Sequence, residues 1–253
     1  MQSYFNVNLE FDRTRVDSII QSTIAANGKG YVCSVEGNNI AVANRNPAFL
    51  KVLNNALVNI CDGSMVATLL SGIHRKTLKP YVGADLFIRY VRMCRYKQFF
   101  LGNTRLILNG LKNNLSKIDP AIANMSFEEL PFKKVEDFDY IGIAEMINKE
   151  NPDIIWVSLG APKQEQFMSL LLPYLNRGVM FGFGAIFNFN AGVGHVKRAP
   201  SLMLKLRTEW LYRAFEEPKK NIPRYWNLIK QMPKLIANEY RGQKNSNRVK
   251  SML

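Results

Sequence analysis

The feature that most constrains this chain is the regular alternation of short apolar runs with longer segments of helical spacing. Each run has four or five residues, which is typical of strands buried on both faces of a parallel sheet. Alternation of this kind predicts an α/β fold with a doubly wound, mainly parallel sheet. The expected strands are residues 31–35, 57–60, 98–101, 154–157 and 179–183, with a further short strand at 186–189 and one strand among loops within 118–136. The expected helices are residues 9–24, 39–57 (one helix or two, broken near Pro47), 64–73, 84–94, 104–115 and 139–149.

One of these runs, residues 154–157, leads into the turn at 160–162 and then into a polar segment. Pro162 is suited to the first turn of a helix, because its φ is fixed and it has no N–H to leave unpaired. In open α/β sheets, ligands bind where strands end and helices begin, and the free N–H groups there favour anions. An ordinary strand-to-helix connection with a solvated polar turn is the alternative, and on this stretch alone it is the better interpretation.

The positive charge of the chain is concentrated at its carboxyl end. The net charge is +14 at pH 7 over 253 residues. Residues 197–253 hold 14 Lys and Arg against 4 Glu and no Asp, a balance of +10, whereas residues 1–196 carry only +4. The composition therefore predicts an α/β core over residues 1–200 and a basic, helical C-terminal appendage over residues 201–253.

Other patterns argue against several classes of protein. No apolar run is long enough to span a membrane, and the first residues lack the pattern of a secretory signal. The three cysteines and two histidines lack the paired spacing of a zinc site, which favours a reduced, cytoplasmic setting. There is no P-loop and no G-x-G-x-x-G, and the glycines after residue 181 are expected to lead into apolar residues rather than into a dinucleotide-type helix.

Polar residues follow two of the predicted strands. Asp62 comes after the run 57–60 and precedes Gly63. A carboxylate at the carboxyl edge of a sheet can act as a general base. Asp is also a good N-cap, and spacing alone favours a cap for the helix that begins at Ser64. Ser34 would bond either a ligand or its own turn, and the turn is the better interpretation.

Seven short segments have a specific order: C-D-G at 61–63, G-A-D-L at 83–86, F-F-L-G at 99–102, V-S-L-G-A-P-K-Q-E at 157–165, F-G-F-G-A-I-F at 181–187, G-H-V-K-R-A-P at 194–200 and E-W-L-Y-R-A-F-E-E-P at 209–218. Together they closely resemble the WecG/TagA/CpsF family of bacterial glycosyltransferases, over roughly residues 5–240. The resemblance implies transfer of a sugar, typically N-acetylmannosamine or its uronic acid, from a UDP donor to a membrane-bound undecaprenyl-diphosphate sugar. It also implies a role in teichoic acid, capsule or exopolysaccharide synthesis, with no metal ion or other cofactor.

The resemblance also implies roles for individual residues. Asp62 matches the family's catalytic base, and Gln164 matches its active-site glutamine. The substrate-binding residues implied by the matching segments are Ser34, Glu36, Tyr81, Gly102, Gly160, Lys163, Lys197, Arg198, Arg213 and Arg224. Arg213 and Arg224 lie in the appendage, which in the family closes over the site and contacts the membrane. Glu36 and Tyr81 stand where the family usually has Asn and Arg, so the identity of the sugar stays open.

Transfer of a glycosyl group to a hydroxyl needs a base for the acceptor proton and stabilisation of the departing diphosphate. Without a metal ion, this stabilisation must come from Lys, Arg, backbone N–H groups and helix N-termini. Lys163, Lys197 and Arg198 lie near glycine-rich turns and are candidates for that role. A single displacement with one base would invert the configuration at the anomeric carbon.

The tail between residues 202 and 240 combines basic and aromatic residues on two helical segments, one around Trp210 and one from Trp226 to Ile236. Basic amphipathic helices lie in membrane interfaces, which predicts a cytoplasmic protein bound peripherally to the inner face of the cell membrane. Core packing of part of each helix is the alternative. Nucleic acid is not an expected partner, because the apolar faces would be unused and no binding motif accompanies them.

Two classes of function therefore stand: a peripheral membrane glycosyltransferase, and a non-catalytic accessory subunit of a capsule or exopolysaccharide glycosyltransferase. Asp62 and Gln164 discriminate between them, because an accessory subunit need not retain both. The expected partners of the enzyme are a UDP-sugar donor, a lipid-diphosphate-linked acceptor and a membrane surface. The acceptor glycan and the oligomeric state, including a homo-oligomer, stay open.

Overall fold

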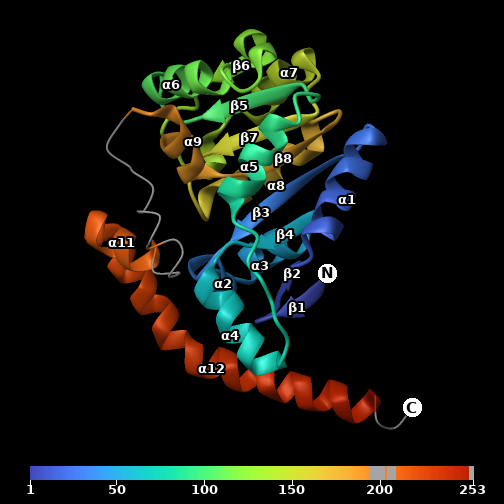
Figure 1. Ribbon diagram of the computed structural model, residues 1–253, viewed down its shortest axis with the longest axis vertical. Coiled ribbons are helices and arrows are strands. Elements are labelled where there is room, and N and C mark those ends of the chain that lie inside the picture. The colour runs from blue at the N-terminus through green and yellow to red at the C-terminus, as the bar shows by residue number, and fades with distance from the viewer. Residues whose placement is uncertain (194–202, 204–208, 251–253) are drawn as a thin grey trace.

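A computed structural model describes residues 1–193, 203 and 209–250, without the side chains of residues 209, 210, 213, 220 and 244–250. Lys197 and Arg198 lie outside the described residues. The body of the protein is a sheet with helices on both faces, and a long C-terminal helix crosses one end of it (Figure 1). The order of the layers confirms the predicted α/β fold.

Six strands form one parallel sheet in the order β4-β3-β8-β7-β5-β6. Every residue of β4, β5, β7 and β8 is buried, as expected where helices cover both faces of a parallel sheet. Because all six strands run the same way, their carboxyl ends meet at one edge of the sheet. The strands are β3 (Lys29–Val35), β4 (Val58–Cys61), β5 (Gln98–Gly102), β6 (Ser126–Glu128), β7 (Ile154–Ser158) and β8 (Gly178–Gly182).

Alternate residues of each strand point into two separate apolar clusters, one on each face. One face is covered by α1 (Arg13–Ala25), α5 (Gly83–Arg92), α6 (Arg105–Leu115) and α9 (Gly184–Ala191). The other face is covered by α2 (Gly37–Ala43), α3 (Pro47–Asn54), α4 (Ser64–His74), α7 (Tyr140–Glu150) and α8 (Lys163–Leu171). A two-stranded antiparallel hairpin, β1 (Gln2–Tyr4) and β2 (Val7–Leu9), joins this second cluster, and short 3-10 turns occupy Pro120–Asn124, Val135–Asp137 and Leu172–Tyr174.

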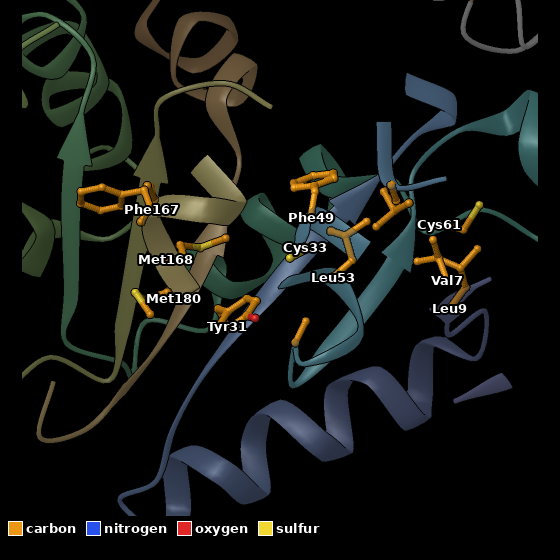
Figure 2. Packing of buried hydrophobic residues seen from close by; sticks show 14 of the residues in the cluster. Val7, Leu9, Tyr31, Cys33, Phe49, Leu53, Cys61, Phe167, Met168 and Met180 are labelled. Carbon is orange, nitrogen blue, oxygen red and sulfur yellow. The ribbon is translucent and has the colours of Figure 1, made fainter. Parts of the chain in front are cut away.

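Figure 2 shows the cluster that fixes α8 against the sheet. Phe167 and Met168 of α8 are fully buried, as are Tyr31 of β3 and Met180 of β8. Burial of a large apolar side chain stabilises a fold by roughly 1.5–3 kcal/mol relative to leaving it exposed. The first turn of α8, which carries Gln164 and Glu165, is therefore held rigidly over the strand ends.

Two predictions about secondary structure are wrong. Residues 186–189 are not a strand but part of α9, so the glycines after β8 do lead into a helix. The helix expected from residue 9 begins at Arg13, because the Asp12 side chain accepts hydrogen bonds from the N–H groups of Thr14 and Arg15, while Leu9 lies in β2. The two helices expected within 39–57 are α2 and α3, and the strand expected within 118–136 is β6.

Two helices lie in the described part of the tail, α11 (Glu209–Glu216) and α12 (Pro218–Lys250). Helix α12 lies across α2 and α4 (Figure 1). Leu228 and Leu235 are buried in this contact, and a side chain at Gly37 would overlap Leu228. Further along, Glu239 accepts a 2.7 Å hydrogen bond from the Phe5 N–H and lies 2.7 Å from Nε2 of His74. Within the described part of the chain, no helix combines the length and the apolar character needed to cross a membrane.

Candidate active site

Asp62 and Ser34 meet at the carboxyl edge of the sheet. Strands β3 and β4 are neighbours, with Val35 opposite Cys61, so the two residues lie side by side. The Ser34 hydroxyl donates a 2.6 Å hydrogen bond to Oδ2 of Asp62. The expected bond of Ser34 to its own turn is therefore wrong, because its hydroxyl reaches across to the next strand end.

The Asp62 carboxylate also contacts the start of α5. Its Oδ1 accepts a 3.2 Å hydrogen bond from the N–H of Gly83, the first residue of that helix. The N-cap residue of α4 is instead Gly63, which has no side chain to cap with, so the expected capping of α4 by Asp62 is wrong. A Cβ at Gly83 would lie 3.2 Å from Ser34 Oγ and 3.4 Å from Asp62 Oδ2, which explains why glycine suits this close approach.

Gln164 joins the turns that follow β7 and β8. Its side chain is buried, and its Oε1 accepts hydrogen bonds from the N–H groups of Gly160 (3.1 Å) and Gly184 (3.0 Å). Its Nε2 donates a 2.8 Å bond to the carbonyl oxygen of Gly182. The two turns touch directly, since a Cβ at Gly184 would lie 2.8 Å from the backbone nitrogen of Gly160. Gln164 thus lies at the same edge of the sheet as Asp62.

A polar connection extends from these turns to the end of β5. Asn103 donates a 3.0 Å bond to the Ser158 hydroxyl, which in turn donates a 2.9 Å bond to the carbonyl oxygen of Gly184. Gly102 has a φ of +94°, and a Cβ there would lie 2.7 Å from the carbonyl oxygen of Ser158. Sequence reasoning assigned no role to Asn103 or Ser158, although a Gly-Asn pair directly after a buried strand is a signal for a special turn.

Glu165 is a second residue without a role in the sequence analysis. It is fully buried, and its Oε1 accepts bonds from Nε2 of Gln164 (3.1 Å) and Nδ2 of Asn39 (3.3 Å). Burial raises the pKa of Glu165 to about 7, although the hydrogen bonds from Gln164 and Asn39 act in the opposite direction. The negative charge of Glu36 raises this pKa further.

Arg224 of the tail reaches this edge. Nη2 of Arg224 donates a 3.3 Å bond to the carbonyl oxygen of Ala161, in the turn between β7 and α8. Helix α12 therefore brings a guanidinium group next to Gly160. The backbone of Arg213 lies in α11, but its side chain is outside the described part of the chain, as are Lys197 and Arg198.

Three other predicted site residues make contacts elsewhere in the structure. Lys163 contacts the carbonyl oxygen of Lys133, and its ammonium nitrogen lies 5.0 Å from the ring centroid of Phe138. Tyr81 is buried, and its hydroxyl lies 3.5 Å from Oδ1 of Asp17 in α1. Glu36 is exposed at the start of α2, where its N–H bonds Oδ1 of Asn39 at 3.3 Å.

The described residues include no group of three His, Cys, Asp or Glu side chains that could hold a metal ion. One D-x-D triplet, a spacing that can present two carboxylates to a divalent metal ion, occurs in the sequence at Asp137–Phe138–Asp139. Its second carboxylate caps α7 by accepting a 3.0 Å bond from the Gly142 N–H. Cys33 and Cys61 are free and buried. Burial, and after it the negative charge of Asp62, raises the pKa of Cys61 to about 12. Because a thiol binds a metal ion as the thiolate, Cys61 is not a candidate metal ligand.

The fold is that of an α/β protein with a doubly wound parallel sheet, and in such proteins ligands bind outside the carboxyl ends of the strands, where the polar groups described above gather. The sequence model of the Glycosyl transferase WecG/TagA/CpsF family matches residues 4–245 of this chain. The chain belongs to this family, and it is a glycosyltransferase.

Similarity to curated proteins extends over nearly the whole chain. The chain is 27% identical over 241 residues to an N-acetylglucosaminyldiphosphoundecaprenol N-acetyl-beta-D-mannosaminyltransferase of Bacillus subtilis (strain 168), covering 91% of this chain and 90% of the relative. It is 26% identical to the protein of the same name from Bacillus spizizenii (strain ATCC 23059 / NRRL B-14472 / W23), covering 88% and 86%. It is 25% identical to that of Staphylococcus aureus (strain MW2), covering 85% of both chains.

Proposed function

We propose that this protein transfers N-acetylmannosamine or a related hexose from a UDP-sugar to an undecaprenyl-diphosphate-linked glycan in the synthesis of a bacterial cell-surface polysaccharide. The observation that carries the proposal is the Asp62 carboxylate, held at the end of β4 by Ser34 and by the Gly83 N–H. The names of the relatives support the acceptor, because those enzymes act on N-acetylglucosaminyldiphosphoundecaprenol.

In this reaction Asp62 is the general base. As the acceptor hydroxyl oxygen forms its bond to the anomeric carbon, its proton passes to the Asp62 carboxylate. The bond between the anomeric carbon and the diphosphate oxygen breaks, and its electron pair leaves with UDP. Ser34 orients the carboxylate by bonding one of its oxygens. A single displacement with one base inverts the anomeric configuration.

The departing diphosphate would be stabilised on the other side of the site, by the turns that Gln164 joins. Helices α8 and α9 both begin at this edge, and the positive ends of their dipoles favour an anion there. Arg224 adds a positive charge at the Ala161 carbonyl. Lys197, Arg198 and Arg213 are further candidates from the family resemblance. These groups can stabilise the leaving group without a metal ion.

The tail supports a division into a core of residues 1–200 and a membrane-binding appendage of residues 201–253. Helix α12 packs on the body through Leu228 and Leu235, while Ile222, Trp226 and Ile229 are more than half exposed. The ammonium group of Lys230 lies 5.2 Å from the centroid of the Trp226 ring. Exposed aromatic and aliphatic side chains beside lysines suit the interface of an anionic membrane, on whose cytoplasmic face we place the protein.

The test is a transfer assay with the purified full-length protein. A panel of UDP-sugars is offered with N-acetylglucosaminyl-diphosphoundecaprenol or a shorter-chain analogue, and both the lipid-linked product and UDP are measured. We expect lipid-linked product with UDP-N-acetylmannosamine or a related donor, and formation of this product at least about a hundredfold slower with the Asp62→Asn variant. Transfer that needs a second protein, and that is unchanged by Asp62→Asn, would identify the chain as an accessory subunit instead.

A further inference from the structure

The environment of Glu165 is unusual for a carboxyl group. A fully buried carboxylate is normally paired with a cation. Glu165 instead receives two side-chain amide N–H groups, from Gln164 and Asn39, and its Oε2 accepts no hydrogen bond from the part of the chain that is described. The titratable side chains that interact with it electrostatically are Glu36 and Cys33. Burial of a carboxyl group without a cation costs free energy, so we expect the hydrogen bonds that Glu165 accepts to have a role in the structure of the site.

These bonds connect three strand ends. Oδ1 of Asn39 accepts a hydrogen bond from the backbone N–H of Glu36, the residue directly after β3. Nδ2 of Asn39 donates a hydrogen bond to Oε1 of Glu165. Glu165 bonds Gln164, whose amide holds the turns after β7 and β8. The chain of bonds therefore runs from the end of β3, the strand that carries Ser34, to the two turns on the opposite side of the site.

We propose that Glu165 is a positioning residue that, through Asn39 and Gln164, sets the distance between the two halves of the active site. One half is the Ser34–Asp62 pair, and the other is the pair of turns at Gly160 and Gly184. This inference rests on the proposed function, in which the first half receives the acceptor and the second half receives the diphosphate. A displacement of about 1 Å between reacting groups can lower a rate by about a hundredfold, so a buried link between the halves would act mainly on kcat.

The chemistry of the link requires an acceptor at residue 165. Both partners present N–H groups to Oε1, and the amide of Gln164 already uses its oxygen for Gly160 and Gly184 and its other N–H for Gly182. Glutamine at residue 165 keeps one acceptor oxygen for both partners. Methionine has a similar volume but offers only a weak acceptor, so both amides would lose their bond.

Three variants test the proposal: Glu165→Met, Glu165→Gln and Asn39→Leu. Gln166→Met is the matched control, because Gln166 is adjacent on α8 but partly exposed. We expect Glu165→Met and Asn39→Leu to lower kcat by about ten- to a hundredfold with KM for the acceptor changed by less than about threefold. Glu165→Gln should retain kcat within about threefold, and Gln166→Met should equal the wild type.

A second measurement does not depend on any substrate. Hydrogen–deuterium exchange followed by mass spectrometry is recorded for peptides covering residues 158–166 and 182–187. Exchange should be at least about fivefold faster in Glu165→Met and Asn39→Leu, and unchanged in Glu165→Gln. If the wild type transferred no sugar but the three variants showed this pattern of exchange, the proposed function would fail, and the positioning role of Glu165 between the two halves would stand. Unchanged exchange and kcat in Glu165→Met, or equal losses in Glu165→Gln and Glu165→Met, would overturn the proposal. Should Glu165→Met not fold, Asn39→Leu decides between the same outcomes.

Discussion

The hydroxyl of Ser34 donates a 2.6 Å hydrogen bond to the carboxylate of Asp62, and this bond joins the ends of the neighbouring strands β3 and β4. The Gly83 N–H occupies the other carboxylate oxygen at 3.2 Å. Each oxygen of a carboxylate can accept more than one bond, so both contacts orient Asp62 and still leave it able to take a proton. A base that is fixed before the substrate arrives loses no further orientational freedom during the reaction.

The first prediction concerns Asp62 as the proposed base. Asp62→Asn keeps the size of the side chain and one of its two acceptor oxygens but removes the ability to take a proton. We expect transfer to fall by about a hundredfold or more, the usual range for a general base, with a thermal unfolding midpoint near that of the wild type. Steady-state transfer kinetics measure the loss. Near-normal turnover in the folded variant would refute the role of Asp62.

The second prediction concerns metal ions. We expect transfer to survive EDTA, because arginine, lysine and helix N-termini are available for the diphosphate. Asp137→Asn should also be as active as the wild type, since Asp137 is exposed and its neighbour in the D-x-D triplet caps α7. Activity that is abolished by EDTA and restored by magnesium or manganese would reveal a metal requirement.

The third prediction concerns the contact between the turns at Gly160 and Gly184. In Gly184→Ala the new Cβ would lie 2.8 Å from the Gly160 nitrogen and 3.0 Å from Oε1 of Gln164, so backbone must move. We expect the free energy of unfolding to fall by roughly 1–3 kcal/mol, together with a loss of transfer. Gly72→Ala is the control, because a Cβ at this residue meets nothing within 4 Å. The substitution also replaces a glycine within α4 by a better helix former. It should stabilise by roughly 0.5–1 kcal/mol. Urea unfolding measures both, and equal behaviour of the two variants would contradict the tight contact.

The fourth prediction uses the titration of Glu165, whose pKa burial raises from 4.5 to about 7. Folding therefore favours the protonated form, so the wild type is most stable, relative to Glu165→Gln, below about pH 4.5. That relative stability is lost as the pH rises through about 7. A shift of this size corresponds to roughly 3 kcal/mol. Urea unfolding of both proteins between pH 5 and pH 8 measures the difference, and a difference that stays constant with pH would contradict a buried, titrating Glu165.

Much of the fold could be predicted from the sequence, because strands buried on both faces appear as short, continuous apolar runs. The run at 186–189 misled this reasoning. Its four residues, Ile-Phe-Asn-Phe, carry too little periodicity to separate a strand from one turn of a helix, and only the packing of Ile186 and Phe187 against the sheet decides between them.

The site was predictable to a lesser degree, because side-chain direction depends on long-range contacts. Asp62 and Gln164 could be placed at strand ends, but the bond from Ser34 to Asp62 requires the register of β3 against β4. Lys163 and Gln164 are adjacent in sequence, yet one points to the segment after β6 and the other to the strand ends. Glu165 lies in a polar triplet that suggests a solvated turn, and its burial follows from the packing of α8 on the sheet and on α3, together with the contact with Asn39 of α2.

The last prediction concerns the outer side of α12 (Figure 1). Trp226 and Ile229 are exposed there among Lys219, Lys230 and Lys234, whereas Leu228 packs on the body. Each lysine near an anionic surface contributes about 1 kcal/mol, and each apolar side chain that enters the interface adds roughly 1.5 kcal/mol or more. The double variant Trp226→Ser/Ile229→Ser should therefore bind anionic vesicles about a hundredfold more weakly, with unchanged stability.

Leu228→Ala is the matched control from the inner side, and it should lower the free energy of unfolding by roughly 2–5 kcal/mol. Co-sedimentation with vesicles at rising salt measures binding, which should weaken as the charges are screened. Truncation after about Pro200 should abolish both binding and transfer, although it also uncovers the α2 surface under Leu228. If the outer double variant sedimented with vesicles as tightly as the wild type, the membrane would have to contact another part of the protein.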